Sequence, residues 1–243
     1  MATYVLVHGG GHGGWCYKPV ARLLRRAGHD VYTPTMTGEG ERAHLLSAHV
    51  GLDMQITDIV NVLQYEDLRD VILVGHSYGG MIITGVADRI ADRVGHLVYL
   101  DAAWPKNGQS LEDHAGPMMQ MARAMGRVVD GIELTLFPGN DPMSYYGVTD
   151  PATQAWMRDR LTPHPWRCFE DKLILTNEAE TARIPQSHIV CTYSIPGRDM
   201  PAITERAEGR VWEIDTGHDL MLTEPEKTAE LLLRVAPLMG GAQ

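Results

Sequence analysis

The sequence predicts a doubly wound α/β domain with a mostly parallel sheet and an inserted helical cap. Short runs of apolar, mostly β-branched residues alternate with segments whose apolar residues recur every three or four positions. The links between these segments are short, as expected when helices cross over between parallel strands. The alternation stops between residues 104 and 185, where prolines, glycines and bulky apolar residues are frequent. We expect this stretch to be the cap.

The first part of the chain supplies four predicted strands. Strands are expected at residues 4–7, 30–33, 71–74 and 97–100, and helices at 20–27, 56–63 and 81–94. Residues 37–50 contain two glycines among charged neighbours and are predicted to form a surface loop. After the cap, strands are expected at 189–193 and 211–214, followed by a helix that contains Leu231 and Val235.

These elements divide the chain into a core and an insertion. Residues 1–103 and 186–243 are assigned to the core, and residues 104–185 to the cap or lid. Methionine and aromatic side chains suit a plastic apolar pocket, so Trp104, Met118 and Tyr145 are predicted to line a substrate pocket. They would otherwise form the core of the cap itself.

The most informative motif is the turn after the third predicted strand. Four apolar residues, 71–74, lead into Gly75-His76-Ser77-Tyr78-Gly79, and a helical pattern follows. A Gly-x-Ser-x-Gly turn between a buried strand and a helix is typical of a nucleophile elbow, where a tight backbone requires glycine beside the serine. Ser77 is therefore the candidate nucleophile.

A second glycine-rich stretch follows the first strand, at residues 9–14. Gly9, Gly11 and Gly14 match a dinucleotide-binding pattern, but that fold expects an acidic residue after the next strand, where residues 33–35 are Thr-Pro-Thr. Backbone amides that face a developing oxyanion explain the loop better. Gly11 and His12 are expected at the pocket. No third ligand accompanies His8 and His12, so no metal site is predicted.

A base and an acid for Ser77 lie further along the chain. His218 comes after the last predicted strand, next to Gly217, and Asp101 follows the fourth strand at the same sheet edge as Ser77. A serine hydroxyl needs a base within hydrogen-bond reach, and that base needs a carboxylate to orient it. Asp219, which flanks the base, is expected to be a local cap or to face solvent.

Composition excludes several classes of partner. The chain has 21 basic and 31 acidic residues, a net charge of −10, which argues against a nucleic-acid surface. No apolar run is long enough for a membrane span, and residue 4 already begins a strand, so we expect no membrane contact and no signal peptide. Three widely separated cysteines predict reduced thiols and a cytoplasmic protein.

Three stretches together resemble the α/β-hydrolase superfamily, and most closely its branch of small-molecule esterases and hydroxynitrile lyases, which includes plant methylesterases. They are residues 5–15 (VLVHGGGHGGW), 75–80 (GHSYGG) and 217–219 (GHD). The resemblance extends over nearly the whole chain. It implies Ser77 as nucleophile, His218 as general base, and the backbone amides of Gly10 and Tyr78 as the oxyanion hole.

The acid departs from the pattern of that branch, where it usually follows the strand after the cap. Pro196 occupies the matching position here, and Asp199 lies three residues later. Other members of the superfamily, such as haloalkane dehalogenases, carry the acid one strand earlier, and residues 99–103 resemble that site. Asp101 is therefore the predicted acid, with Asp199 as the alternative.

The resemblance implies a serine hydrolase that cleaves a small apolar or aromatic carboxylic ester, or a methyl carbamate, through an acyl-enzyme and without a cofactor. In hydroxynitrile lyases of this branch a threonine and a lysine occupy the positions of Gly9 and Asp219 here, which favours hydrolysis. A lyase-like enzyme and a non-enzymatic small-molecule receptor on the same fold are the alternatives. The expected partner is the substrate, and a homodimer is left open.

Overall fold

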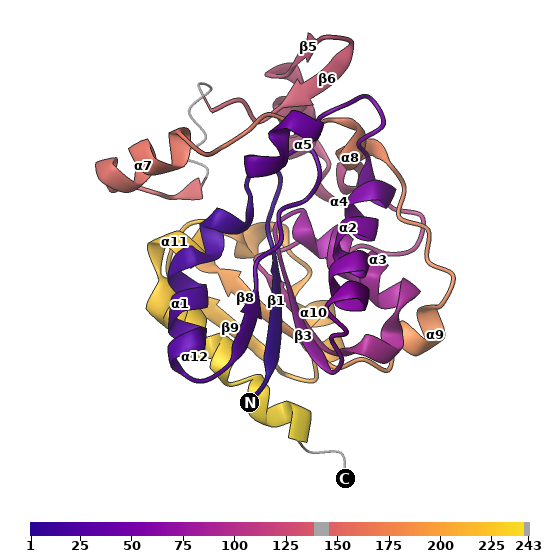
Figure 1. Cartoon of the computed structure of the whole chain (residues 1–243), viewed down its shortest axis with the longest axis vertical. Coiled ribbons are helices and arrows are strands. Elements are labelled where there is room, and N and C mark those ends of the chain that lie inside the picture. The colour runs from indigo at the N-terminus through magenta and orange to yellow at the C-terminus, as the bar shows by residue number, and fades with distance from the viewer. Residues whose placement is uncertain (139–145, 241–243) are drawn as a thin grey trace.

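The computed structural model describes residues 1–138 and 146–240. A six-stranded sheet forms its centre, with the order β2-β1-β3-β4-β8-β9 and parallel pairing between neighbours (Figure 1). The strands are β1 (Thr3–Val7), β2 (Asp30–Tyr32), β3 (Val71–His76), β4 (Val94–Leu100), β8 (Gln186–Cys191) and β9 (Val211–Ile214). The order changes direction at β1, so the sheet is doubly wound and the predicted α/β fold is confirmed.

Helices cover both faces of this sheet (Figure 1). One face carries α1 (Lys18–Arg26), α11 (Leu220–Thr223) and α12 (Pro225–Leu233), and the other carries α2 (Leu52–Tyr65) and α3 (Gly79–Arg89). Alternation along β1 explains the two cores. Tyr4 and Leu6 pack in the α1–α12 core, whereas Val5 and Val7 pack in the α2–α3 core.

Short helices connect these elements and correct two expectations. They are η1 (Gly14–Tyr17), η2 (Gly40–Leu45), η3 (Ala91–Arg93), η4 (Thr192–Gly197), α10 (Met200–Arg206) and η5 (Ala236–Gly240). The helix predicted to reach Val94 ends at Arg89, and Val94 begins β4. Residues 37–50 do not form only a surface loop, because Glu39 is fully buried.

The segment between β4 and β8 contains strands as well as helices. Its helices are α4 (Leu111–Ala115), α5 (Pro117–Ala124), α7 (Pro151–Arg158), α8 (Arg167–Glu170) and α9 (Glu178–Thr181). The strands β5 (Arg127–Val129), β6 (Ile132–Thr135) and β7 (His164–Pro165) form a separate antiparallel sheet. The expectation of a purely helical cap was wrong because these strands are too short to show a two-residue alternation.

The inserted segment is anchored to the main core. Trp166, Cys168, Phe169 and Leu173 are buried in the same cluster as the residues of α2 and α3. Figure 1 shows β5 and β6 projecting at one end of the molecule, beyond the carboxyl ends of the central strands. The domain boundaries at residues 104 and 185 stay a prediction. In the ranges 1–138 and 146–240, none of the helices is long and apolar enough to cross a bilayer.

The start of α3 depends on a glycine. A Cβ built on Gly80 would lie 1.9 Å from the carbonyl oxygen of Ala103, whereas nothing lies within 4 Å of one built on Gly197. We expect Gly80→Ala to lower the free energy of unfolding by about 3 kcal/mol, the upper part of the usual range for an overpacked core. Urea denaturation should show this loss, with little change for the control Gly197→Ala. Equal stability of the two variants would contradict the tight contact.

Candidate active site

Ser77 lies in a strained turn between β3 and α3. Its φ is +54°, a left-handed conformation that side chains other than glycine rarely adopt. The flanking glycines make the turn possible. A Cβ on Gly75 would lie 2.5 Å from the Gly79 carbonyl oxygen, and one on Gly79 would lie 2.8 Å from the Val7 carbonyl oxygen. The Ser77 side chain is partly exposed, at the carboxyl end of β3.

Asp101 and His218 meet at the same sheet edge. Asp101 directly follows β4, and His218 lies in the loop after β9. The imidazole Nδ1–H of His218 donates a hydrogen bond to Asp101 Oδ2, with a distance of 2.6 Å between Nδ1 and Oδ2. Asp101 is 1% exposed and His218 is 7% exposed. A carboxylate that accepts from Nδ1 orients an imidazole and selects the tautomer that a general base needs.

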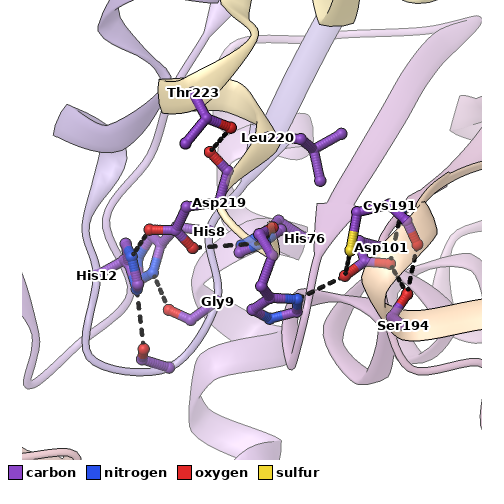
Figure 2. Close-up of polar contacts among 12 residues, drawn as sticks. His8, Gly9, His12, His76, Asp101, Cys191, Ser194, Asp219, Leu220 and Thr223 are labelled. Carbon is purple, nitrogen blue, oxygen red and sulfur yellow. Dashed lines mark hydrogen bonds and ion pairs between the residues drawn. The ribbon is translucent and has the colours of Figure 1, made fainter. Parts of the chain in front are cut away.

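Several further donors hold the Asp101 carboxylate, and Figure 2 shows two of these residues, Cys191 and Ser194. The Arg198 guanidinium lies 2.8 Å from Oδ1, and the backbone amide of Cys191 lies 3.2 Å from the same oxygen. The Ser194 hydroxyl also donates to Oδ1, and the Cys191 thiol donates to Oδ2. Burial alone would raise the pKa of Asp101, but His218, Arg198 and Ser194 hold it well below its ordinary value. Asp101 is therefore a carboxylate at neutral pH.

Asp199 has a different environment. It is exposed at the start of α10, where its carboxylate accepts a hydrogen bond from the Ala202 amide at 3.2 Å. This is an ordinary helix cap. The structure thus brings Asp101, and not Asp199, to the imidazole of His218.

His76 connects the base to the elbow. Its Nε2–H donates to the carbonyl oxygen of His218 at 3.0 Å, and the two rings are 4.7 Å apart between centroids. Burial, followed by the charge of His218, lowers the pKa of His76 to about 3, so this ring is neutral. Because His76 directly precedes Ser77, the hydrogen bond ties the loop of His218 to the turn that contains Ser77.

The glycine loop approaches Ser77 from β1. A Cβ built on Gly9 would lie 2.8 Å from the Cβ of Ser77, so only glycine allows this approach. Neither the Gly10 amide nor the Tyr78 amide donates a hydrogen bond to any residue in the described ranges. Both are the amides expected to face an oxyanion. A Cβ on Gly10 would also lie 3.0 Å from Phe169 Cζ, so this part of the loop lies against α8.

The residues predicted to line the pocket lie in several environments. Gly11 is part of the glycine loop, and Trp104 is partly buried against His188, with 5.8 Å between ring centroids. Met118 is 46% exposed on α5. His12 is 1% exposed with both ring nitrogens bonded to the protein, so it is not a pocket wall. Tyr145 lies outside the described residues.

Sequence reasoning missed the other buried charges around the site. Asp219, expected to cap a helix or face solvent, is fully buried, and its Oδ2 lies 2.9 Å from His12 Nε2. Glu39 and His164 form a second fully buried pair, with 2.6 Å between Oε1 and Nδ1. In the sequence, the one hint that Asp219 belongs to the site is that it directly follows His218. Within residues 1–138 and 146–240, no group of histidine, cysteine or acidic side chains could hold a metal ion.

Comparisons with known proteins identify relatives over almost the full chain. The model described as "Alpha/beta hydrolase family" matches residues 4–231. A carbendazim hydrolyzing esterase from a Nocardioides species is 38% identical, and the alignment covers 96% of this chain and 98% of that protein. Methylesterase 1 of Arabidopsis thaliana is 30% identical, with 96% and 95% covered.

A solved structure agrees with these relatives. It is an extracellular α/β-hydrolase from a Paenibacillus species, described as sharing structural and functional homology with tobacco salicylic acid binding protein 2. The two structures superpose with a TM-score of 0.79 and 25% sequence identity, over 96% of this chain and 98% of that one.

The two candidate acids can be separated by replacement with asparagine. We expect Asp101→Asn to lower kcat on a p-nitrophenyl ester by about 10⁴-fold, because an amide cannot stabilise the imidazolium or select its tautomer. Asp199→Asn should change kcat less than twofold, since asparagine caps a helix as well as aspartate does. Steady-state kinetics at pH 7 make the comparison. The opposite ranking would transfer the role to Asp199.

The charge of Arg198 should affect the protonation of His218, because Arg198 lies beside Asp101. Its positive charge beside the carboxylate opposes protonation of His218, so replacing it with the neutral Arg198→Met should raise the pKa of the imidazole. The acidic limb of the kcat/KM profile should then move up by about one pH unit. Arg198→Lys, which keeps the charge, is the control. An unchanged limb in the methionine variant would show that the guanidinium only holds the loop.

Proposed function

The chain belongs to the alpha/beta hydrolase family and is an ester hydrolase of the carboxylesterase type, and we propose that Ser77 carries its reaction through a covalent acyl-enzyme. The observation that supports this most directly is the hydrogen bond of 2.6 Å between Asp101 and His218, formed at the sheet edge where the strained turn presents Ser77. A serine with an oriented imidazole beside it is the arrangement that acyl transfer requires.

The proposed steps follow from this arrangement. His218 Nε2 takes the proton of the Ser77 hydroxyl as its oxygen attacks the carbonyl carbon of the substrate. The amides of Gly10 and Tyr78 donate hydrogen bonds to the oxyanion of the tetrahedral intermediate. His218 then gives its proton to the leaving alcohol, and the ester bond breaks. A water molecule, deprotonated by the same imidazole, releases the acid and restores Ser77.

We propose that the substrate is a small apolar or aromatic ester, with a methyl carbamate as the first compound to test. The relative from Nocardioides, named for hydrolysis of the carbamate carbendazim, supports the carbamate, and the plant methylesterase supports a methyl ester.

The hydroxynitrile lyase alternative has less support. Gly9 carries no hydroxyl, and Asp219 is a buried carboxylate paired with His12 rather than an exposed cation. A cyanide leaving group would find no positive side chain at either position. A small-molecule receptor on this fold would keep the geometry without turnover, and labelling of Ser77 with a reactive phosphonate tests that alternative.

We also propose a cytoplasmic location. Cys16, Cys168 and Cys191 are buried and free, as is usual in a reducing compartment. The Paenibacillus structure is described as extracellular, so this fold also occurs outside cells. Fractionation of expressing cells with enzymatic markers for each compartment tests this point.

A fluorophosphonate should modify Ser77 with a stoichiometry of one, seen by intact mass and peptide mapping. We expect Ser77→Ala to lose this labelling and to lower ester and carbamate hydrolysis by about 10⁶-fold, while it keeps the wild-type melting temperature. Ser110→Ala, which removes a buried hydroxyl from the start of α4, is the matched control and should label normally. A folded wild-type protein that does not label would contradict the acyl-enzyme mechanism and favour the receptor.

A further inference from the structure

We propose that two buried pairs, each of an acidic side chain and an imidazole, position the oxyanion loop, residues 9–11. The first pair is Asp219 with His12, and the second is Glu39 with His164. Their side chains are all at most 1% exposed. This inference rests on the proposed function, because it assigns a role to residues around the proposed oxyanion hole. None of the four side chains has a part in the proton transfers described above.

Hydrogen bonds to the preceding carbonyl group set the direction of the Gly10 amide. The Gly9 carbonyl oxygen accepts hydrogen bonds from His8 Nδ1–H at 2.8 Å and from the His12 amide at 3.3 Å. The amide of Met36 donates to Nε2 of His8, so the ring proton must be on Nδ1. In a trans peptide the C=O and N–H bonds point in opposite directions. The Gly10 N–H therefore points away from these donors and stays available.

The first pair holds the next carbonyl group. Nδ1 of His12 lies 3.0 Å from the Gly10 carbonyl oxygen, and Nε2 lies 2.9 Å from Asp219 Oδ2. Both ring nitrogens face acceptors, so both carry protons and the ring is an imidazolium. Burial opposes this charge, but Asp219 outweighs burial and raises the pKa of His12. Since Asp219 is the neighbour of His218, the pair also connects the oxyanion loop to the loop of the base.

The second pair holds the amide at the other side of the same peptide. The Gly11 N–H donates to Glu39 Oε1 at 2.5 Å, and His164 Nδ1–H donates to that oxygen at 2.6 Å. Burial alone would raise the pKa of Glu39, but His164 lowers it, so the acceptor is a carboxylate. His164 lies in β7 of the inserted segment, which therefore contributes to the oxyanion loop.

The peptide between Gly10 and Gly11 is thus fixed at both ends. Its oxygen is held by an imidazolium and its N–H by a carboxylate, and charged hydrogen bonds of this kind are roughly twice as strong as neutral ones. Without them the loop would be flexible, since Gly11 already has a φ of +76° and glycine has many accessible conformations. A donor fixed before the substrate arrives is what stabilises an oxyanion most effectively.

Removing either pair should therefore lower kcat more than it raises KM. We expect His12→Leu and Glu39→Leu each to lower kcat on a p-nitrophenyl ester by about 10- to 100-fold, with KM changed less than threefold, as for loss of a supporting hydrogen bond. Glu39→Gln keeps an oxygen for the Gly11 amide and should recover most of the lost kcat. The rate of Ser77 inactivation by the fluorophosphonate should follow the same order.

A control separates this role from general stability. His96 is equally buried and bonds to Ser187 Oγ at 2.8 Å, but it lies near the start of β4, far along the strand from Asp101. His96→Leu should lower the melting temperature and leave kcat unchanged. The inference is overturned if Glu39→Leu melts like His96→Leu and keeps kcat within threefold, or if Glu39→Gln is as impaired as Glu39→Leu. Failure of wild-type Ser77 to label would instead refute the acyl-enzyme mechanism.

Discussion

The site depends on one buried charge, the carboxylate of Asp101. Removing a carboxylate from water costs several kcal/mol, and only close opposite charges and hydrogen bonds offset that cost. Here His218, Arg198 and Ser194 donate to the two oxygens, as does the Cys191 amide. These donors come from the last residue of β8 and from the loops after β8 and β9, so satisfying the carboxylate brings those segments together with the end of β4. The orientation of the His218 imidazole follows from that constraint.

Two more buried acidic side chains with a paired partner lie near the glycine loop. Asp219 and Glu39 are fully buried acids, and each is paired with a histidine. Such pairs add little to stability in general, and a well-packed apolar core would serve that purpose as well. What they provide is direction, because a carboxylate accepts a hydrogen bond only where a donor is placed. Their cost in stability is compatible with the proposed role of the loop, which is to hold the Gly10 amide in one orientation.

Much of the fold could be predicted from the periodicity of the sequence, whereas only part of the site could be predicted. The buried run before Ser77 and the residues after β4 and β9 showed which side chains reach one sheet edge, because parallel strands end on the same side. The pairing of Glu39 with His164 joins positions 125 residues apart and leaves no local pattern. Asp219 was misjudged because an acidic residue beside a loop histidine is normally solvated. The strands β5 to β7 were missed because they span two to four residues.

The position of the acid has a topological consequence. In the sheet order β4-β8-β9, an acid after β8 would be next to the strand that carries His218, whereas Asp101 lies two strands away. Neighbouring strands are about 4.8 Å apart, so the carboxylate and the imidazole must meet across the end of β8. The chain after β8 therefore cannot occupy the space between the carboxylate and the imidazole. It turns at once into η4 and returns with Ser194 and Arg198 beside Asp101. Asp101 itself has a φ of +43°, which directs it out of the strand. Because the carboxylate follows β4 and not β8, the segment after β8 does not supply the carboxylate. It supplies hydrogen-bond donors to the carboxylate instead.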